Sequence, residues 1–149
     1  MLLRKYGFKN SQLKYLGFLL LLCAMNLSAS EPVETPNSIP GSTKITAEEL
    51  IKLLQNKTGI VLVDSRMEDN SVGYIETSVN LPNVDTNCDS LSGILATKST
   101  PVIFYCNGPF CGRSAKAVKI ALSCGYSMIY WYREGFKDWK DKGYPFVTK

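Results

Sequence analysis

The chain has 149 residues, of which 45% are hydrophobic and 11% aromatic, as in a folded globular domain. Its formal net charge of +4 comes from basic residues that precede the first acidic residue, Glu31; charges balance after that point, so no nucleic-acid-binding surface is expected. The chain contains no histidine, which excludes Ser-His-Asp triads, Cys-His dyads and histidine-ligated metal sites. We therefore expect neither a metal nor a cofactor.

Residues 1–30 have the layout of a secretory signal peptide. A basic stretch leads into an apolar run at 16–25, and small residues at 28–30 follow. The apolar run is shorter than the roughly 20 residues needed to cross a bilayer. We expect cleavage after Ala29 or Ser30, with an uncleaved anchor as the alternative. Cleavage predicts an exported, periplasmic or otherwise extracytoplasmic protein without stable membrane insertion.

Residues 31–44 contain three prolines and few apolar side chains, which predicts a flexible linker. The folded domain is then expected to span 45–149. It begins with a helix that ends near Gln55, because Thr46 and Glu49 have the spacing of a capping box.

Short apolar runs alternate with helical patterns along the rest of the chain. Strands are predicted at 60–64, 102–105 and 128–131, a short strand pairing of 74–75 with 79–81, and helices at 89–95, 114–123 and 136–142. Strands that alternate with helices indicate an α/β fold with a parallel sheet.

Four cysteines follow the predicted signal peptide: Cys88, Cys106, Cys111 and Cys124. Disulfides persist in exported proteins, and four cysteines allow three full pairings, among which the sequence does not choose. Cys124 ends a predicted helix and is expected to be buried and inert, whereas Cys88 is either free or cross-linked. The spacing contains no Cys-x-x-Cys pair, so it does not favour zinc.

The strongest functional signal follows the strand at 102–105. Cys106 comes at the carboxyl end of this strand, where open parallel sheets form their sites. Backbone N–H groups of a tight loop, the positive end of the next helix and Arg113 lower the pKa of a thiol there below its usual value of about 8.5. We therefore predict that Cys106 is a catalytic thiolate. The predicted substrate-binding loop consists of Asn107, Gly108, Pro109, Phe110, Cys111, Gly112, Arg113 and Ser114.

From about Ile45 to its end, the chain resembles the rhodanese (sulfurtransferase) domain. The motifs are Asp64-Ser65-Arg66, Gly73-Tyr74-Ile75 with 79–82, Tyr105-Cys106, Arg113-Ser114, and 134–139. The resemblance implies a three-layer fold with a central, mainly parallel sheet of about five strands flanked by helices. It also implies that Cys106 forms a persulfide. Six residues separate Cys106 from Arg113, more than the family usually has, and Cys111 is extra; this variant is similar to that of exported single-domain rhodaneses.

We expect a sulfurtransferase that moves sulfane sulfur from a donor of the thiosulfate or polysulfide class through Cys106 to a thiol or cyanide. Two alternatives stay open: a thiol–disulfide redox protein using Cys106 and Cys111, and a non-catalytic module that carries sulfur or binds a partner. Cys111 is accordingly a resolving thiol, a disulfide partner of Cys106 or a passive loop residue.

Asp64 and Arg66 are expected to form a structural ion pair. The expected partners are a small sulfur-containing substrate and an exported thiol or redox protein.

Overall fold

The computed structural model describes residues 34–56, 58–67 and 72–148. The predicted signal peptide lies outside these residues. Within them, every helix is too short or too polar to cross a membrane.

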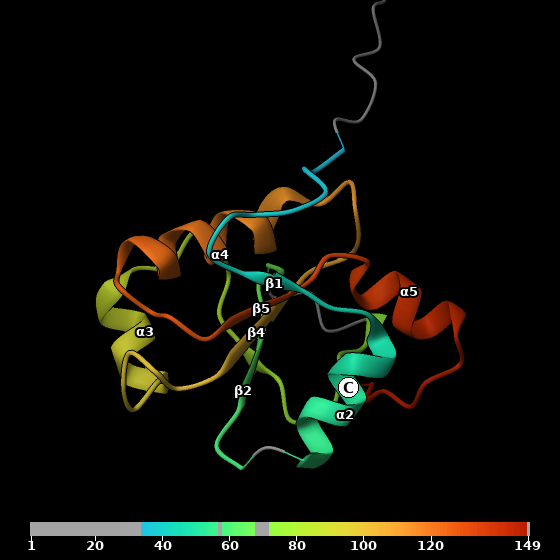
Figure 1. The fold of residues 1–149 in the computed structure, drawn as a ribbon. Helices are drawn as coiled ribbons and strands as arrows, with labels where there is room; N and C mark the ends of the chain where they lie inside the picture. The colour runs from blue at the N-terminus through green and yellow to red at the C-terminus, as the bar shows by residue number, and fades with distance from the viewer. Residues whose placement is uncertain (1–33, 57, 68–71, 149) are drawn as a thin grey trace, which may run out of the picture. The chain divides into compact units, whose positions relative to one another are not determined.

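A five-stranded sheet forms the middle layer of the domain (Figure 1), in the order β1-β5-β4-β2-β3, and all neighbours are parallel. The strands are β1 (Thr43–Lys44), β2 (Val61–Asp64), β3 (Val79–Asn80), β4 (Val102–Tyr105) and β5 (Ile129–Tyr132). Parallel neighbours require crossover connections, and these place helices on both faces of the sheet. The sheet confirms the predicted α/β class.

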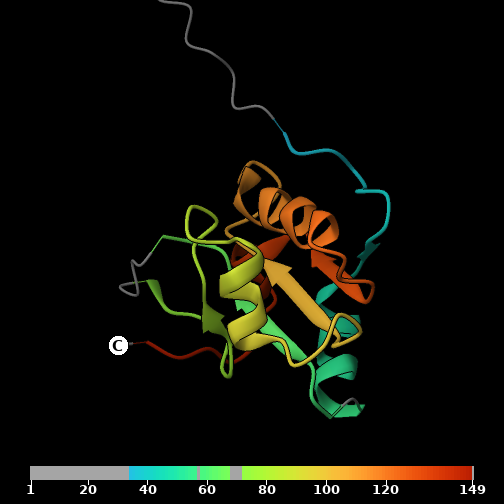
Figure 2. The ribbon, with the colours of Figure 1, turned by 90° about the vertical axis from the view of Figure 1, so that its left-hand side faces the viewer.

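Helices cover both faces of the sheet (Figures 1 and 2): α3 and α4 lie on one face, α2 and α5 on the other. Their bounds are α2 (Ala47–Asn56), α3 (Cys88–Ile94), α4 (Gly112–Ser123) and α5 (Gly135–Asp141). Successive side chains of a strand point to opposite faces. In β4, Val102 and Phe104 therefore join the core under α3 and α4, while Ile103 and Tyr105 join the core under α2 and α5. The three-layer architecture is confirmed.

Local signals place α2 correctly. The backbone N–H of Thr46 donates to Glu49 Oε2 at 2.8 Å, and the N–H of Glu49 donates to Thr46 Oγ1 at 3.2 Å. This reciprocal pair is the predicted capping box, and the helix begins at the next residue, Ala47.

The short strands differ from the prediction. Residues 74–75 and 79–81 do not pair with each other: Tyr74 bridges Val147 in antiparallel fashion, and β3 pairs with β2. The second edge of β2 is the partner of β3, because Val63 and Asp64 are already held in an extended strand by their pairing with β4 on the other edge.

The described part of the predicted linker, residues 34–44, is docked against the domain instead of being flexible. Strand β1 pairs with the edge of β5, and Ile39 is buried in the core beneath α4. An unpaired strand edge offers backbone N–H and C=O groups to which another segment can hydrogen-bond. The composition of the segment does not indicate this pairing. The folded domain therefore starts before Ile45.

A disulfide joins Cys88, the first residue of α3, to Cys124, the residue that caps the end of α4. The two Cα atoms are 5.5 Å apart, and the cysteines are separated by 36 positions in the sequence. The prediction that Cys124 is an inert buried thiol is wrong, since the packing of α3 on α4 brings the two helix ends together.

Candidate active site

Cys106 lies directly after β4, a central strand of the sheet, and its side chain is fully buried. The following loop spans 107–111, and the N–H of Cys111 donates to the carbonyl of Gly108 at 2.9 Å. This turn directs the chain into α4, which begins at Gly112, two residues earlier than predicted. The loop thus folds Cys111 back toward Cys106.

The Cys106 sulfur has two neighbours from this loop and helix. Its thiol donates to the carbonyl oxygen of Cys111 at 2.8 Å, and it lies 3.2 Å from Ser114 Oγ. The indole N–H of Trp131 donates to the same Ser114 oxygen at 3.0 Å, which leaves the hydroxyl proton of Ser114 free to turn toward the sulfur. The backbone N–H of Ser114 also lowers the pKa of this thiol, which favours its anion. Ser114 can therefore supply two donors to a sulfur anion at residue 106.

The structure gives the lowered thiol pKa to Cys111 and not to Cys106. A hydrogen bond to Cys111 and burial raise the pKa of Cys106, and the donors of Ser114 only partly oppose them. The hydrogen bond from Cys106 lowers the pKa of Cys111 to about 5, with help from the N–H groups of Arg113 and Asn107 and from the Arg113 charge. The environment of the reduced pair thus favours the thiolate at Cys111, opposite to the thiolate predicted at Cys106, and the catalytic role of Cys106 stays a prediction.

Helix α5 supports the loop from the other side. The N–H of Phe136 donates to the carbonyl of Cys106 at 2.8 Å, and that of Lys137 donates to the carbonyl of Asn107 at 3.0 Å. Gly135 has a φ of +65°, and a Cβ there would collide with the carbonyl oxygen of Cys106. The motif at 134–139 therefore acts as a backbone support for the cysteine loop.

A strap formed by residues 34–36 also holds the loop. The N–H of Thr35 donates to the carbonyl of Pro109 at 2.8 Å. The buried Arg133 anchors this strap: its guanidinium donates to the carbonyls of Pro36 and Thr35, at 3.0 and 2.8 Å, and to the Glu34 carboxylate at 2.7 Å. The sequence analysis missed both the strap and Arg133. No local pattern predicts that Arg133 contacts a segment about a hundred residues away.

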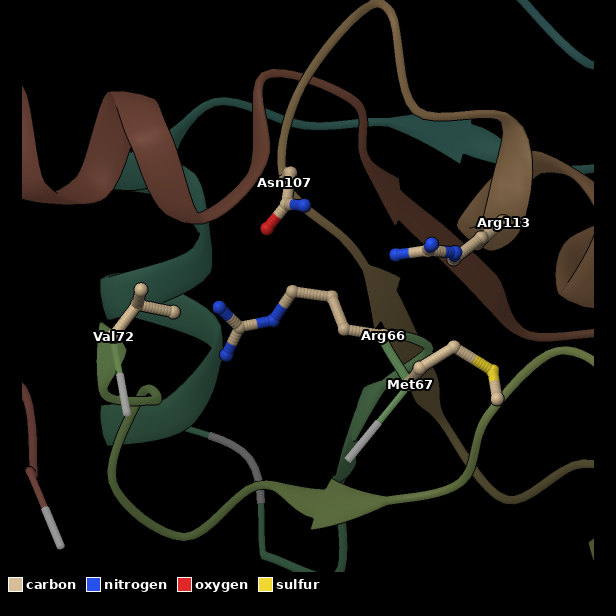
Figure 3. A pocket seen from close by; sticks show the side chains of 5 residues that line it. All are labelled: Arg66, Met67, Val72, Asn107 and Arg113. Carbon is tan, nitrogen blue, oxygen red and sulfur yellow. The ribbon is translucent and has the colours of Figure 1, made fainter. Parts of the chain in front are cut away.

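A cavity of about 300 Å³ opens beside the loop, lined by Arg66, Met67, Val72, Asn107 and Arg113 (Figure 3). Arg66 is held by the predicted structural ion pair, with its Nη2 at 2.6 Å from Asp64 Oδ2 and 2.8 Å from the carbonyl of Gly73. Two guanidinium groups and an amide line this cavity, and such a lining suits an anionic ligand.

A second cavity, of about 280 Å³, lies on the outer side of the loop. It is lined by Asn107, Gly108, Pro109, Phe110, Cys111 and Lys137. Asn107 lines both cavities, while Phe110 projects outward with 65% of its surface exposed. Cys111 is therefore accessible from outside the loop, whereas Cys106 is enclosed. The structure places most of the predicted loop residues along these two cavities, and the ligand-binding roles of all of them stay predictions.

The site thus combines a parallel sheet, a central strand that ends in a cysteine, and a loop and a helix that enclose this cysteine. Residues 46–142 match the rhodanese-like domain family. The chain belongs to this family.

Individual relatives agree with this assignment. The chain is 28% identical, over 106 residues, to the rhodanese domain-containing protein CG4456 of Drosophila melanogaster, covering 63% of this chain and 94% of that protein. The BH2092 protein of Bacillus halodurans has a similar structure, with a TM-score of 0.62 and 20% identity over 93% of this chain and 87% of that one.

Two structures with named activities share the fold. The polysulfide-sulfur transferase homodimer of Wolinella succinogenes superimposes with a TM-score of 0.61 and 22% identity, over 73% of this chain and 80% of that one. The thiosulfate sulfurtransferase of Pseudomonas aeruginosa gives a TM-score of 0.61 and 18% identity, over 72% of this chain but only 20% of that one.

Proposed function

We propose that the protein transfers sulfane sulfur through a persulfide on Cys106. The observation that carries this proposal is Ser114: its hydroxyl lies 3.2 Å from the Cys106 sulfur, and its hydroxyl and N–H both favour the anionic form of that sulfur. Such donors are suited to stabilising a sulfur anion inside a buried site. Membership of the rhodanese-like family supports the same chemistry.

The reaction divides into two displacements. The Cys106 proton passes to solvent, and the Cys106 sulfur attacks the sulfane sulfur of the donor. The donor's S–S bond breaks, the donor leaves as an anion with the bond's electron pair, and Cys106 keeps a persulfide. An acceptor thiolate or cyanide then attacks the outer sulfur and releases the Cys106 thiolate. The cavity lined by Arg66 and Arg113 suits a donor that carries an anionic group.

The test uses the purified protein with thiosulfate or polysulfide as donor and cyanide as acceptor. We expect thiocyanate formation, and we expect Cys106→Ser to abolish it. A Cys106→Ser protein that keeps full activity while Cys111→Ser loses it would reassign the sulfur-carrying residue.

A second candidate, thiol–disulfide exchange, is favoured by the direct contact between Cys106 and Cys111. Intact mass separates the two functions. An adduct of about 32 Da on Cys106 after treatment with the donor supports sulfur transfer. A reversible Cys106–Cys111 disulfide with no adduct supports redox exchange alone.

We also propose that the protein is exported, as its N-terminal sequence predicts. The Cys88–Cys124 disulfide supports this location, because such bonds persist in oxidising compartments. Cell fractionation of the full chain, together with N-terminal sequencing of the purified product, tests the location and the cleavage point.

A further inference from the structure

Cys111 folds over Cys106 within one short loop. Its carbonyl accepts the Cys106 thiol proton at 2.8 Å, and its N–H is fixed by the Gly108 carbonyl at 2.9 Å. Each of the two thiols also shifts the pKa of the other. The two residues are therefore in contact while both thiols are free. Only five positions of one loop separate the residues whose sulfurs would bond.

Cys111 is also prepared to act as a nucleophile. The hydrogen bond with Cys106 lowers the pKa of its thiol most, and the N–H groups of Arg113 and Asn107 and the Arg113 charge lower it further, to about 5. Thiolates, not thiols, attack disulfides and persulfides. Lowering the pKa weakens each thiolate as a nucleophile, but full ionisation and direct contact with the target offset that loss.

No other described cysteine competes with Cys111. Over residues 34–56, 58–67 and 72–148, Cys106 and Cys111 are the free cysteines, while Cys88 and Cys124 are bonded to each other. The second cavity, on which Cys111 opens, gives a small anion or an external thiol a route to this side of the loop.

We propose that Cys111 resolves the Cys106 persulfide and releases hydrosulfide, leaving a Cys106–Cys111 disulfide. This step rests on the proposed function and adds an activity to it. The Cys111 thiolate attacks Sγ of the Cys106 persulfide, the persulfide S–S bond breaks, and the outer sulfur leaves as HS⁻ with its proton. The sulfane sulfur is reduced and the two cysteine sulfurs are oxidised, so the electrons balance without a further reagent. An external thiol then reduces the disulfide for the next cycle.

The experiment is a single turnover without a reductant. The wild-type protein and Cys111→Ser are each treated with polysulfide, freed of excess donor, and followed by intact mass and by sulfide assay. We expect both proteins to gain about 32 Da. The wild type then releases one equivalent of sulfide and yields a peptide cross-linked between residues 106 and 111. Cys111→Ser keeps its adduct and releases at least tenfold less sulfide over the same time.

The control is a double variant, Cys88→Ser with Cys124→Ser, which removes the other disulfide. It should release sulfide as the wild type does. A wild-type adduct as long-lived as that of Cys111→Ser, with no cross-linked peptide, would overturn the resolving step and leave sulfur transfer standing. If neither protein gains an adduct, the proposed function fails and the resolving step fails with it.

Discussion

The two cysteine pairs of this protein make a direct comparison. Cys88 and Cys124 are 36 positions apart in the sequence, lie at the ends of two helices, and are bonded to each other. Cys106 and Cys111 lie in one loop, in contact, and are free. In the first pair, each sulfur is bonded to the other and neither is free to react. The second is surrounded by N–H groups, a hydroxyl and an arginine that decide which sulfur holds the proton.

The comparison teaches that position in the fold, and not residue type, gives each cysteine its role. A bond between distant residues stabilises the native state mainly by restricting the unfolded chain. A free pair held by native hydrogen bonds contributes a charge that is available for reaction. The following predictions test whether stability and reactivity are separated in this way.

Removing the bonded pair should cause the largest loss of stability. For the double variant Cys88→Ser with Cys124→Ser, loop-closure entropy predicts a loss of about 3–4 kcal/mol in the free energy of unfolding. Urea titration measures the loss, and sulfur transfer at a temperature where the variant stays folded should be unchanged. A loss of transfer in the folded variant would show that the two pairs are coupled.

The free pair, Cys106 and Cys111, should carry one negative charge at pH values well below those at which an ordinary thiol ionises. With a Cys111 pKa of about 5, the thiol is almost fully ionised at pH 6.5. A free thiol of pKa about 8.5 is ionised there to roughly one part in a hundred. Thiolate ultraviolet absorbance, followed as pH is lowered, should fall around pH 5 in the reduced pair.

Two variants sharpen this titration. Cys111→Ser should abolish the acidic transition, and Cys106→Ala should move it to higher pH, because Cys111 then loses the hydrogen bond that contributes most to its acidity. An acidic transition that survives in Cys111→Ser would return the thiolate to Cys106.

Gly135→Ala should displace the loop that carries Cys106 and Cys111 and leave the Cys88–Cys124 disulfide unchanged. An alanine at φ +65° costs about 1 kcal/mol, and its Cβ also meets the backbone of residues 106–108, so we expect a loss of roughly 2–3 kcal/mol and of sulfur transfer. Gly143→Ala is the matched control, since Gly143 has a φ of +72° but no atom within 4 Å of the added Cβ. Thermal unfolding and the transfer assay should separate the two variants; equal effects would remove the argument for a backbone contact.

Arg133→Met should loosen the strap over the loop. Losing the guanidinium leaves the carbonyls of Thr35 and Pro36 without their donors, which costs about 1–2 kcal/mol. We expect slower sulfur transfer and faster hydrogen exchange at Cys111, whose loop the strap holds through Pro109. Lys116→Met, at an exposed position on α4, is the control and should change neither. Unaltered exchange at Cys111 in Arg133→Met would show that the strap does not position the loop.

Much of the fold follows from short-range patterns. The apolar runs of β2, β4 and β5 and the capping box of α2 lie where the sequence predicts them, because side-chain period and caps depend on residues only a few positions apart. The sequence predicts the wrong partner for the short strand β3 for the opposite reason. Its pairing depends on β2, a strand distant in the sequence, which β4 holds in place.

By itself the sequence determined the α/β class, the place of Cys106 at the end of a central strand and the family resemblance. Only the tertiary structure decided that Cys88 bonds to Cys124, that residues 34–36 hold the loop through Arg133, and that Cys111 is the acidic thiol. The physical reason is that disulfide choice, proton sharing and docking depend on distances through space. Periodic and capping signals depend only on distances along the chain.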